Sequence, residues 1–364
     1  MKFSAARDVL LKPLQAVIGV VERRQTMPIL SNVLLVVKGS ELAVTATDLE
    51  VELVAMAEVS VEAEGEITVS GRKLLDICRA LPEGATVEIS VSGEKANVRA
   101  GRSKFSLATL PAAEFPTVDD IKAGQTIQVS QELLGRLIEK THFSMAQQDV
   151  RYYLNGMLLE TGGKHLRCVA TDGHRLALCE AELEVSYDEQ QVIVPRKGVL
   201  ELQRLLGAEG AVNLELGPNH ARVELEGIRF TSKLIDGRFP EYERVIPQDS
   251  SNELTADRES FKGALQRTAI LSNEKYRGIR LIIRDSGVVM QAHNPEQEEA
   301  EEELEVTYSG EDIEIGFNVN YLLDALGAVD GDEVALSVLD GNSSCLIRKP
   351  GRDDCKFVVM PMRL

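Results

Sequence analysis

The stretch Asp172-Gly173-His174-Arg175 holds the residue types that acid–base or phosphoryl-transfer chemistry requires. A carboxylate and an imidazole can exchange a proton, and an arginine can hold a phosphate or an oxyanion. An enzyme centred on Asp172 and His174 is therefore one hypothesis for this chain. No G-x-S-x-G, Walker or G-x-G-x-x-G pattern in the sequence supports it.

A comparison within the chain argues against that enzyme. The positions that match Asp172 read Asp48-Leu49-Glu50 earlier in the chain and Asn294-Pro295-Glu296 later. Aspartate or asparagine recurs at these positions without the histidine and the arginine. Aspartate at the end of a strand readily accepts hydrogen bonds from the backbone of a turn. We therefore expect Asp172 to belong to a turn and not to a catalytic centre.

These positions lie in a segment that occurs three times. Residues 32–53, 152–178 and 279–301 each read as two strands joined by a tight turn. A helical pattern precedes each segment, and a strand that enters a second helix follows it. Matching positions are about 122 to 127 residues apart, the size of a small domain and far longer than a solenoid repeat. The predicted fold class is α+β, with three repeated domains at 1–124, 125–250 and 251–364.

The composition places limits on location and chemistry. The chain has 364 residues, 44% of them hydrophobic, with no long apolar run and no apolar leader, so we expect a cytoplasmic protein. Its five cysteines are Cys78, Cys168, Cys179, Cys345 and Cys355, and none forms a C-x-x-C pair. This predicts reduced, mostly structural thiols. Zinc-ligand spacings are missing, so neither a metal nor a cofactor is expected.

The charges are unevenly distributed. The net charge is -18, whereas nucleic-acid-binding domains usually carry a basic surplus. Acidic residues crowd into expected strands and loops such as 62–66 and 296–305, and basic residues gather on or beside expected helices. Such segregation could give one positive surface on an acidic body. Helix faces that are simply solvated would explain the pattern equally well.

Two further segments are candidates for interaction. Basic and apolar residues fill 95–107, and glutamates fill 296–302, downstream of the apolar pair Ile270-Leu271. Domains in series whose ends are complementary can close a ring head to tail, although both charge runs could also be solvated faces of a monomer. The apolar tail 357–364 fits a buried last strand or, alternatively, the wall of a groove for a partner.

Longer stretches resemble a known family. They are Pro28-Ile29-Leu30, Ala46-Thr47-Asp48-Leu49-Glu50, Val194-Pro195-Arg196-Lys197-Gly198, and residues 148–156, 170–176, 270–275, 294–301 and 358–364. Over essentially its whole length the chain resembles the bacterial DNA polymerase III beta subunit, the replicative sliding clamp, of the proteobacterial type. The resemblance implies three clamp-type domains and a head-to-tail dimer. That dimer would be a six-domain ring, with helices inside and sheets outside.

The same resemblance implies a function without catalysis. The ring would encircle duplex DNA without reading its sequence and act as a processivity factor. Its partners would be a second copy of the chain, the clamp loader, the replicative polymerase catalytic subunit, and translesion polymerases and repair proteins that carry clamp-binding peptides. No membrane partner is expected. Because topology retains a ring on DNA, weak phosphate contacts suffice, and an acidic exterior limits stray binding.

Three sets of site residues follow from the resemblance. The DNA contacts would be Arg24, Arg72, Gln148, Tyr152, Tyr153, Arg196 and Lys197. The groove for partner peptides would comprise Leu154, Thr171, Gly173, His174, Arg175, Leu176, Pro240, Arg244, Val245, Ser344, Val358, Val359, Met360, Pro361, Met362, Arg363 and Leu364. The dimer interface would use Lys73, Lys95, Arg102, Lys104, Phe105 and Leu107 against Ile270, Leu271, Glu296, Glu298, Glu299 and Glu302.

Overall fold

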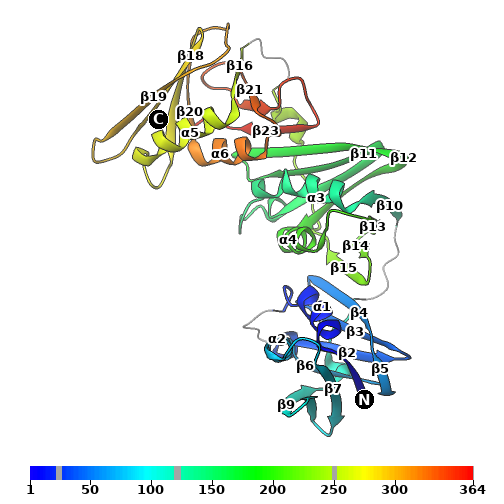
Figure 1. The fold of residues 1–364 in the computed structure, drawn as a ribbon. Helices are drawn as coiled ribbons and strands as arrows, with labels where there is room; N and C mark the ends of the chain where they lie inside the picture. Colours follow the sequence, from blue (N-terminus) through cyan, green and yellow to red (C-terminus); the bar gives the residue numbers. More distant parts are fainter. Residues whose placement is uncertain (22–26, 119–123, 248–251, 364) are drawn as a thin grey trace. The chain divides into compact units, whose positions relative to one another are not determined.

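The computed structural model describes residues 1–21, 27–118, 124–247 and 252–363 (Figure 1). The chain divides into two compact units. The first comprises residues 1–132 and 197–234, and the second comprises residues 133–196 and 235–364. Over the described ranges, none of the helices combines the length and the apolar character needed to span a membrane.

The first unit is built on one sheet of thirteen strands. Their order is β10-β13-β14-β15-β4-β3-β2-β6-β9-β8-β7-β1-β5. The strands are β1 (Lys2–Ala6), β2 (Asn32–Lys38), β3 (Glu41–Thr47), β4 (Val51–Glu58), β5 (Ser60–Ala63), β6 (Gly65–Ser70), β7 (Thr86–Ser92), β8 (Lys95–Ala100), β9 (Ser103–Leu110), β10 (Gln125–Ser130), β13 (Ala211–Leu216), β14 (His220–Leu225) and β15 (Ile228–Lys233). Strand β15 pairs antiparallel with β4, from Ile228 opposite Ala55 to Ser232 opposite Val51. This pairing joins the strands of two repeats into one sheet.

Helices α1 (Arg7–Val17) and α2 (Gly71–Ala80) pack against each other, and α1 also packs on β3 and β4. Leu10 and Leu14 of α1 are buried, as are Leu74 and Cys78 of α2. The spacing of four residues within each pair matches about one turn of a helix, so each helix presents one apolar face to the sheet. Helix α4 (Arg196–Leu205) belongs to this unit from Lys197 onward.

The second unit has two sheets. One has the order β11-β12-β23-β22-β21-β16 and the other the order β19-β18-β17-β20. The strands are β11 (Gly156–Thr171), β12 (Arg175–Pro195), β16 (Glu253–Asp257), β17 (Gly278–Arg284), β18 (Gly287–His293), β19 (Glu299–Glu305), β20 (Ile313–Asn318), β21 (Glu333–Val338), β22 (Cys345–Arg348) and β23 (Cys355–Val359). Nearly all of α3 (Gln131–Glu139) lies here, together with α5 (Arg258–Thr268) and α6 (Val319–Ala328).

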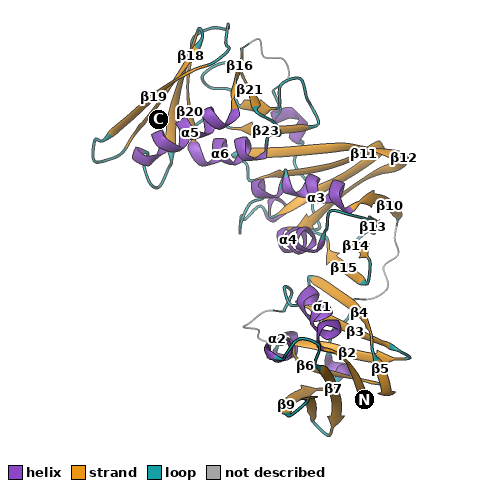
Figure 2. Ribbon diagram, viewed as in Figure 1, coloured by secondary structure: helices purple, strands orange, loops and turns teal. Residues whose placement is uncertain are grey.

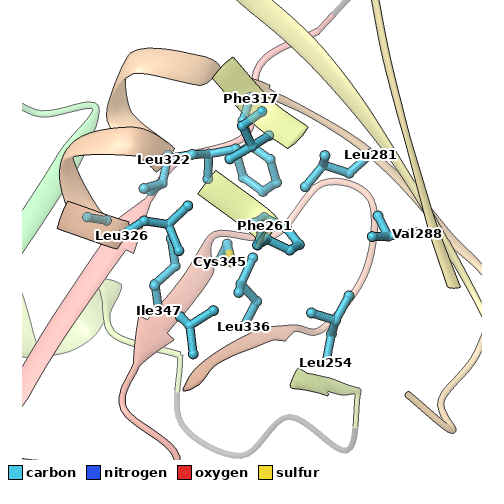
Figure 3. Close-up of a cluster of buried hydrophobic side chains, with 14 of the residues drawn as sticks. Leu254, Phe261, Leu281, Val288, Phe317, Leu322, Leu326, Leu336, Cys345 and Ile347 are labelled. Atoms are coloured by element: carbon cyan, nitrogen blue, oxygen red, sulfur yellow. The ribbon is translucent and has the colours of Figure 1, made fainter. Parts of the chain in front are cut away.

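Helices α5 and α6 lie against each other, and α6 also contacts β20 and β23 (Figure 2). Phe261 of α5, Phe317 of β20 and Leu322 of α6 meet in the core between them, and all three are fully buried (Figure 3). Burying a side chain of this size stabilises the fold by about 1.5–3 kcal/mol. This core holds β23, the last strand of the chain, in a fixed position.

The repeated segments adopt related structures. The turn between β2 and β3 has Gly39 at φ +62°, and the turn between β17 and β18 has Ser286 at φ +62°. In the second repeat, Gly163 at φ +57° interrupts the register of β11 against β12 on both sides. Positive φ is easiest for glycine, which explains the glycines at the first two positions.

The expectation of five reduced thiols is wrong for one pair. Cys179 and Cys355 form a disulfide, whereas Cys78, Cys168 and Cys345 are free and buried. The two bonded residues are directly opposite each other in the pairing of β12 with β23. They are 176 residues apart in sequence, so spacing along the chain gave no sign of their contact.

Candidate functional site

An apolar hollow of about 180 Å³ lies in the second unit, beside the end of β23. Its lining residues are Arg151, Tyr153, Leu154, Thr171, Gly173, Arg175, Leu176, Pro240, Glu241, Tyr242, Val245, Val358 and Met360. The pairing of Leu176 in β12 with Val358 in β23 brings these distant segments together. Most of the lining residues are apolar or aromatic, and we call the three charged ones, Arg151, Arg175 and Glu241, the rim. Such a hollow suits apolar side chains of a ligand.

The turn from Asp172 to Arg175 forms part of this rim. The Asp172 carboxylate accepts hydrogen bonds from the backbone N–H of His174 at 2.9 Å and of Arg175 at 3.1 Å. The Thr171 hydroxyl donates to the Arg175 carbonyl at 2.6 Å and accepts from the Gly173 N–H at 3.1 Å. The prediction that Asp172 belongs to a turn is confirmed. Its carboxylate accepts backbone hydrogen bonds and pairs with Arg175 Nε.

Arg175 fixes this turn to the rest of the unit. Its Nε donates to Asp172 at 3.1 Å, its Nη2 donates to the Phe143 carbonyl at 2.8 Å, and its Nη1 pairs with Asp324. The guanidinium also lies over the Tyr321 ring, 4.5 Å from its centroid. These four partners hold the Arg175 side chain in a single conformation. Arg175 therefore shapes the rim of the hollow.

Arg151 also contacts this turn. Its Nε and Nη2 donate to the Asp149 carboxylate at 3.0 Å and 2.9 Å, and Nη2 also donates to the Asp172 carbonyl at 3.2 Å. The side-chain bond from Arg151, followed by the bond from the Arg151 backbone N–H, lowers the pKa of Asp149 to about 2. Gly173 has φ +89°, and a Cβ there would lie 2.9 Å from Arg151 Nη1. Positive φ favours glycine here, and a larger residue would have to displace the Arg151 guanidinium.

The tail of the chain is both a buried strand and a wall of the hollow. Val358 and Val359 are each 1% exposed, whereas Met360 is 37% exposed. The Met360 N–H donates to the His174 carbonyl at 2.9 Å, which continues the pairing beyond β23. The buried last strand is therefore confirmed for Val358 and Val359, and Met360 lines the hollow, whereas the binding of a partner there stays a prediction.

The predicted groove residues divide into two groups. Leu154, Thr171, Gly173, Arg175, Leu176, Pro240, Val245, Val358 and Met360 line the hollow. Among the other described members of the set, His174, Arg244 and Arg363 are exposed, and the Ser344 hydroxyl donates to the Val245 carbonyl at 3.3 Å. Val359, Pro361 and Met362 do not line the hollow, and Leu364 lies outside the described residues.

Four lining residues were not predicted for the groove: Arg151, Tyr153, Glu241 and Tyr242. Tyr242 is buried in a cluster with Phe239, and its hydroxyl bonds to Arg167 and Glu160. The aromatic pair Phe239 and Tyr242, three residues apart on either side of Pro240, was a usable signal. Arg151 gave none, because its role depends on the position of Gly173.

The predicted DNA contacts belong to both units. In the first unit, Arg72 donates to the Val21 carbonyl at 2.9 Å, and Lys197 forms an ion pair with Asp48. In the second unit, Gln148 and Tyr152 are exposed. Tyr153 lines the hollow and stacks edge-on against Tyr152, while Arg196 is half-buried, and burial followed by the charge of Arg175 lowers its pKa. Arg24 lies outside the described residues.

The predicted interface residues lie on several elements, with Lys73 in α2, Ile270 and Leu271 in a short helical turn, and the others on or beside β8, β9 and β19. In the first unit, residues 103–108 of β9 pair with β8, and the β9 pairing with β6 covers only Thr109 and Leu110. Lys73, Lys95, Arg102 and Lys104 are exposed, while Phe105 is half-buried and Leu107 buried. In the second unit, β19 is the edge strand of its sheet. Glu296, Glu298, Glu299 and Ile270 are exposed, Leu271 is half-buried, and Glu302 is bound within its own chain by Arg267.

Comparison with known proteins identifies the class of this fold. Three family models match in sequence: the N-terminal domain of the DNA polymerase III beta subunit over residues 1–119, its central domain over 128–241 and its C-terminal domain over 243–363. Beta sliding clamps are similar over the full length of both chains, with 56% identity in Pseudomonas putida and 51% in Escherichia coli.

Solved structures agree with the sequence matches. The DNA polymerase III subunit beta of Pseudomonas aeruginosa is 54% identical, with a TM-score of 0.98 and full coverage of both chains. A sliding clamp from the same species bound to griselimycin has a TM-score of 0.97, 55% identity and full coverage of both chains. The fold and its three consecutive domain matches define a clamp-type protein. The chain belongs to the DNA polymerase III beta subunit family.

Membership in this family decides between the enzyme and the clamp, the two hypotheses drawn from the sequence. The α+β fold class with three clamp domains is confirmed. The chain is a processivity factor and a non-catalytic accessory subunit. The enzyme centred on Asp172 and His174 is not supported, in agreement with the structural role of the Asp172 carboxylate.

Proposed function

We propose that the apolar hollow beside β23 receives the clamp-binding peptides of the replicative polymerase, the clamp loader, translesion polymerases and repair proteins. The carrying observation is the preformed apolar cavity between Leu176, Val358 and Met360, held by the Thr171–Asp172 turn. A preformed site avoids the cost of ordering on binding. The flexible thioether of Met360 at its edge can adapt to different peptide side chains.

The described part of the proposed peptide site comprises the lining residues together with His174, Arg244, Ser344, Val359, Pro361, Met362 and Arg363. His174 contributes its carbonyl to the tail, and Ser344 contacts Val245. These residues support the hollow or extend it toward the end of the chain. The charged side chains at the rim would select the polar residues that flank an apolar peptide motif.

Two copies of the chain would join through edge strands. Residues 103–108 of β9 carry lysine and apolar side chains, and β19 carries glutamates. Pairing of two strand edges of opposite charge satisfies backbone groups and fixes the orientation of the partners. The apolar residues Phe105, Leu107, Ile270 and Leu271 would pack beside the paired strands. The result is a head-to-tail dimer with six domains, which we place at 1–124, 125–250 and 251–364 of each chain.

The ring would encircle duplex DNA, and the DNA-facing residues would be Arg24, Arg72, Gln148, Tyr152, Tyr153, Arg196 and Lys197. Arginine, lysine and glutamine suit contacts to phosphate without base readout. Retention by topology allows these contacts to be few and salt-sensitive. Because its template and its partners are those of DNA replication, we place the protein in the cytoplasm.

Removal of the tail tests the peptide site. A chain that ends at Val359 keeps β23 and loses Met360, one wall of the hollow. We expect it to lose binding of a fluorescently labelled polymerase-derived peptide, measured by fluorescence polarisation, while remaining a dimer in sedimentation. Val185→Ala, a change at an exposed apolar residue of β12 that does not line the hollow, is the matched control. Unchanged peptide affinity in the shortened chain would contradict the assignment.

A further inference from the structure

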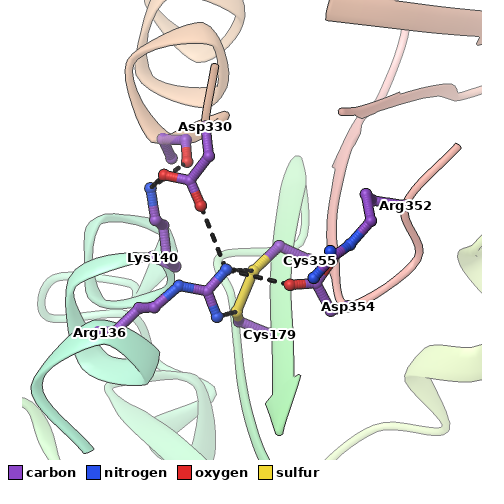
Figure 4. A network of polar contacts seen from close by, with 8 residues as sticks. Arg136, Lys140, Cys179, Asp330, Arg352, Asp354 and Cys355 are labelled. Carbon is purple, nitrogen blue, oxygen red and sulfur yellow. Dashed lines mark hydrogen bonds and ion pairs between the residues drawn. A yellow bond between two sulfur atoms is a disulfide. The ribbon is translucent and has the colours of Figure 1, made fainter. Parts of the chain in front are cut away.

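Three cysteines lie in a row across three neighbouring strands of the second unit. Cys168 of β11 is opposite Cys179 of β12, and Cys179 is opposite Cys355 of β23. Side chains that are directly opposite in an antiparallel pair point to the same face of the sheet. Cys179 could therefore bond to either neighbour, and the structure joins it to Cys355, with their Cα atoms 4.1 Å apart (Figure 4).

Arg136 of α3 distinguishes the two possible pairs. Its Nη1 lies 3.9 Å from Cys179 Sγ, and its Nη2 lies 3.7 Å from Cys355 Sγ. Asp330 and Asp354 hold the same guanidinium at 3.1 Å and 3.0 Å, as Figure 4 shows. A fixed cation beside a sulfur favours the thiolate, the form that takes part in disulfide exchange.

Cys168 has a different environment. It is completely buried, and this burial raises the pKa of its thiol to about 12. A thiol that stays protonated does not attack a disulfide. Cys78 and Cys345 are also buried free thiols. Cys355, in contrast, is partly exposed.

We propose that Cys179 and Cys355 form a reversible redox link that fastens β23 to β12. Cys179 falls within the central-domain match and Cys355 within the C-terminal-domain match, so the link would join two domains covalently. It lies at the start of β23, the strand that continues into Val358 and Met360 of the hollow. Disulfides in reducing compartments are usually transient and sensitive to redox conditions, which fits a reversible link.

A dithiol reductant opens the link in two exchange steps. One thiolate of the reductant attacks Cys355 Sγ, the disulfide bond breaks, and its electron pair leaves on Cys179 Sγ beside Arg136 Nη1. The second thiolate of the reductant attacks its partner sulfur in the mixed disulfide and releases the Cys355 thiolate beside Nη2. Each released thiolate takes up one proton. The reductant gives up two electrons and two protons and becomes a disulfide, and oxidised glutathione reverses the reaction, yielding two glutathione thiols.

Opening the link removes a covalent constraint from one end of β23. The strand then depends on its ladder with β12 and β22 and on the packing of Phe357. Local opening of a strand end becomes easier when such a constraint is lost. The reduced protein should therefore exchange the amide hydrogens of β23 faster than the oxidised protein.

The test uses the full chain equilibrated with either oxidised glutathione or dithiothreitol. We expect three titratable thiols in denaturant after oxidation and five after reduction, with peptide mapping that assigns the lost pair to Cys179 and Cys355. Amide exchange in β23 should be about tenfold faster in the reduced protein, while exchange in β17 stays unchanged. Cys168→Ala should keep this response and Cys355→Ala should abolish it. Five thiols after oxidation, a Cys168–Cys179 pair, or equal exchange in both states would overturn the proposal. Each of these results can be obtained with the unmodified chain, without any variant.

Discussion

The turns at Asp48 and Asp172 have the same backbone hydrogen bonds and different surroundings. Asp48 accepts from the N–H groups of Glu50 at 2.9 Å and Val51 at 2.7 Å, as Asp172 does from His174 and Arg175. Thr47 and Thr171 repeat the same bonds to the turn through their hydroxyls. One local sequence pattern therefore builds the same turn in two repeats.

The two turns differ in the partner of the second carboxylate oxygen. Asp48 pairs with Lys197 of α4, whereas Asp172 pairs with Arg175 of its own turn. The residue that follows also differs, with Leu49 at φ +77° and Gly173 at φ +89°. In the first unit the turn leads into β4, the strand of the first repeat that pairs with β15 of the second, and we call this pairing the joint. In the second unit the turn borders the apolar hollow. The residues that the two turns share are therefore those that build the turn, and the residues that differ are those that belong to the proposed peptide site.

The largest effect is expected from Asp48→Ala. The Asp48 side chain is 4% exposed, and its loss leaves the N–H groups of Glu50 and Val51 without their acceptor. We expect the opening free energy of β4 amides in hydrogen exchange to fall by about 3 kcal/mol. Asp172→Ala should lower the opening free energy of β12 amides by about 1 kcal/mol, because Arg175 keeps its bonds to Asp324 and to the Phe143 carbonyl. Equal losses at the two sites would contradict the distinction between joint and rim.

Gly173→Leu copies the residue of the first turn into the second. The new Cβ would lie 2.9 Å from Arg151 Nη1, and the side chain would displace Arg151 at the rim of the hollow. We expect about thirtyfold weaker binding of a polymerase-derived peptide, equivalent to about 2 kcal/mol. The reciprocal change Leu49→Gly is the control and should leave peptide affinity unchanged. A loss of affinity in the control, or none in Gly173→Leu, would break the comparison.

The pH dependence of the rim should follow Asp149. Its pKa of about 2 lies below the ordinary value of 3.8, so the interaction with Arg151 favours the folded state above pH 3.8. That contribution is lost as the pH falls through about 2, because the protonated carboxyl no longer pairs with Arg151. Carboxyl carbon chemical shifts measured by NMR should show a midpoint near 2 for Asp149. In Arg151→Ala the midpoint should rise toward the ordinary value, and an unchanged midpoint would exclude Arg151 as the cause.

The smallest effect concerns the two cations that begin α4. Lys197 is engaged by Asp48, whereas Arg196 Nη1 lies 3.4 Å from the Met145 carbonyl and pairs with no carboxylate of the described residues. Each phosphate contact contributes about 0.9 to the slope of log affinity against log salt. We expect Arg196→Ala to lower that slope by about one and Lys197→Ala by less than half as much. Filter binding to duplex DNA over a salt series can resolve the difference, and equal slopes would show that the pair with Asp48 does not restrain Lys197.

The repeat explains what the sequence could predict. The turn role of Asp172 was visible because Asp48 recurs without histidine or arginine, and the apolar tail was recognised as strand or groove wall. The link between Cys179 and Cys355 was not visible, because it depends on β12 pairing with a strand 176 residues away. The same reason applies to the ion pair of Lys197 with Asp48. Contacts that depend on the packing of distant segments leave no local pattern.

The residues on the rim show a second limit. Arg151 carries no apolar periodicity or motif of its own, and its position follows from Asp149 and from the space left by Gly173. Glu302 was predicted to face a partner chain, and the structure shows it held by Arg267 at 3.0 Å and 2.9 Å from Nε. That Glu302 contributes to the dimer interface stays a prediction, and Arg267 would then lie in the interface with it.

Retention on DNA of different topology tests the central claim most directly. The protein is loaded onto a nicked circular plasmid with a clamp loader and ATP, and the plasmid is then cut once. A clamp that encircles DNA should remain on the uncut circle and leave through the ends of the linear molecule. Retention that is the same before and after the cut would mean that contact alone holds the protein, and would contradict a ring around the duplex.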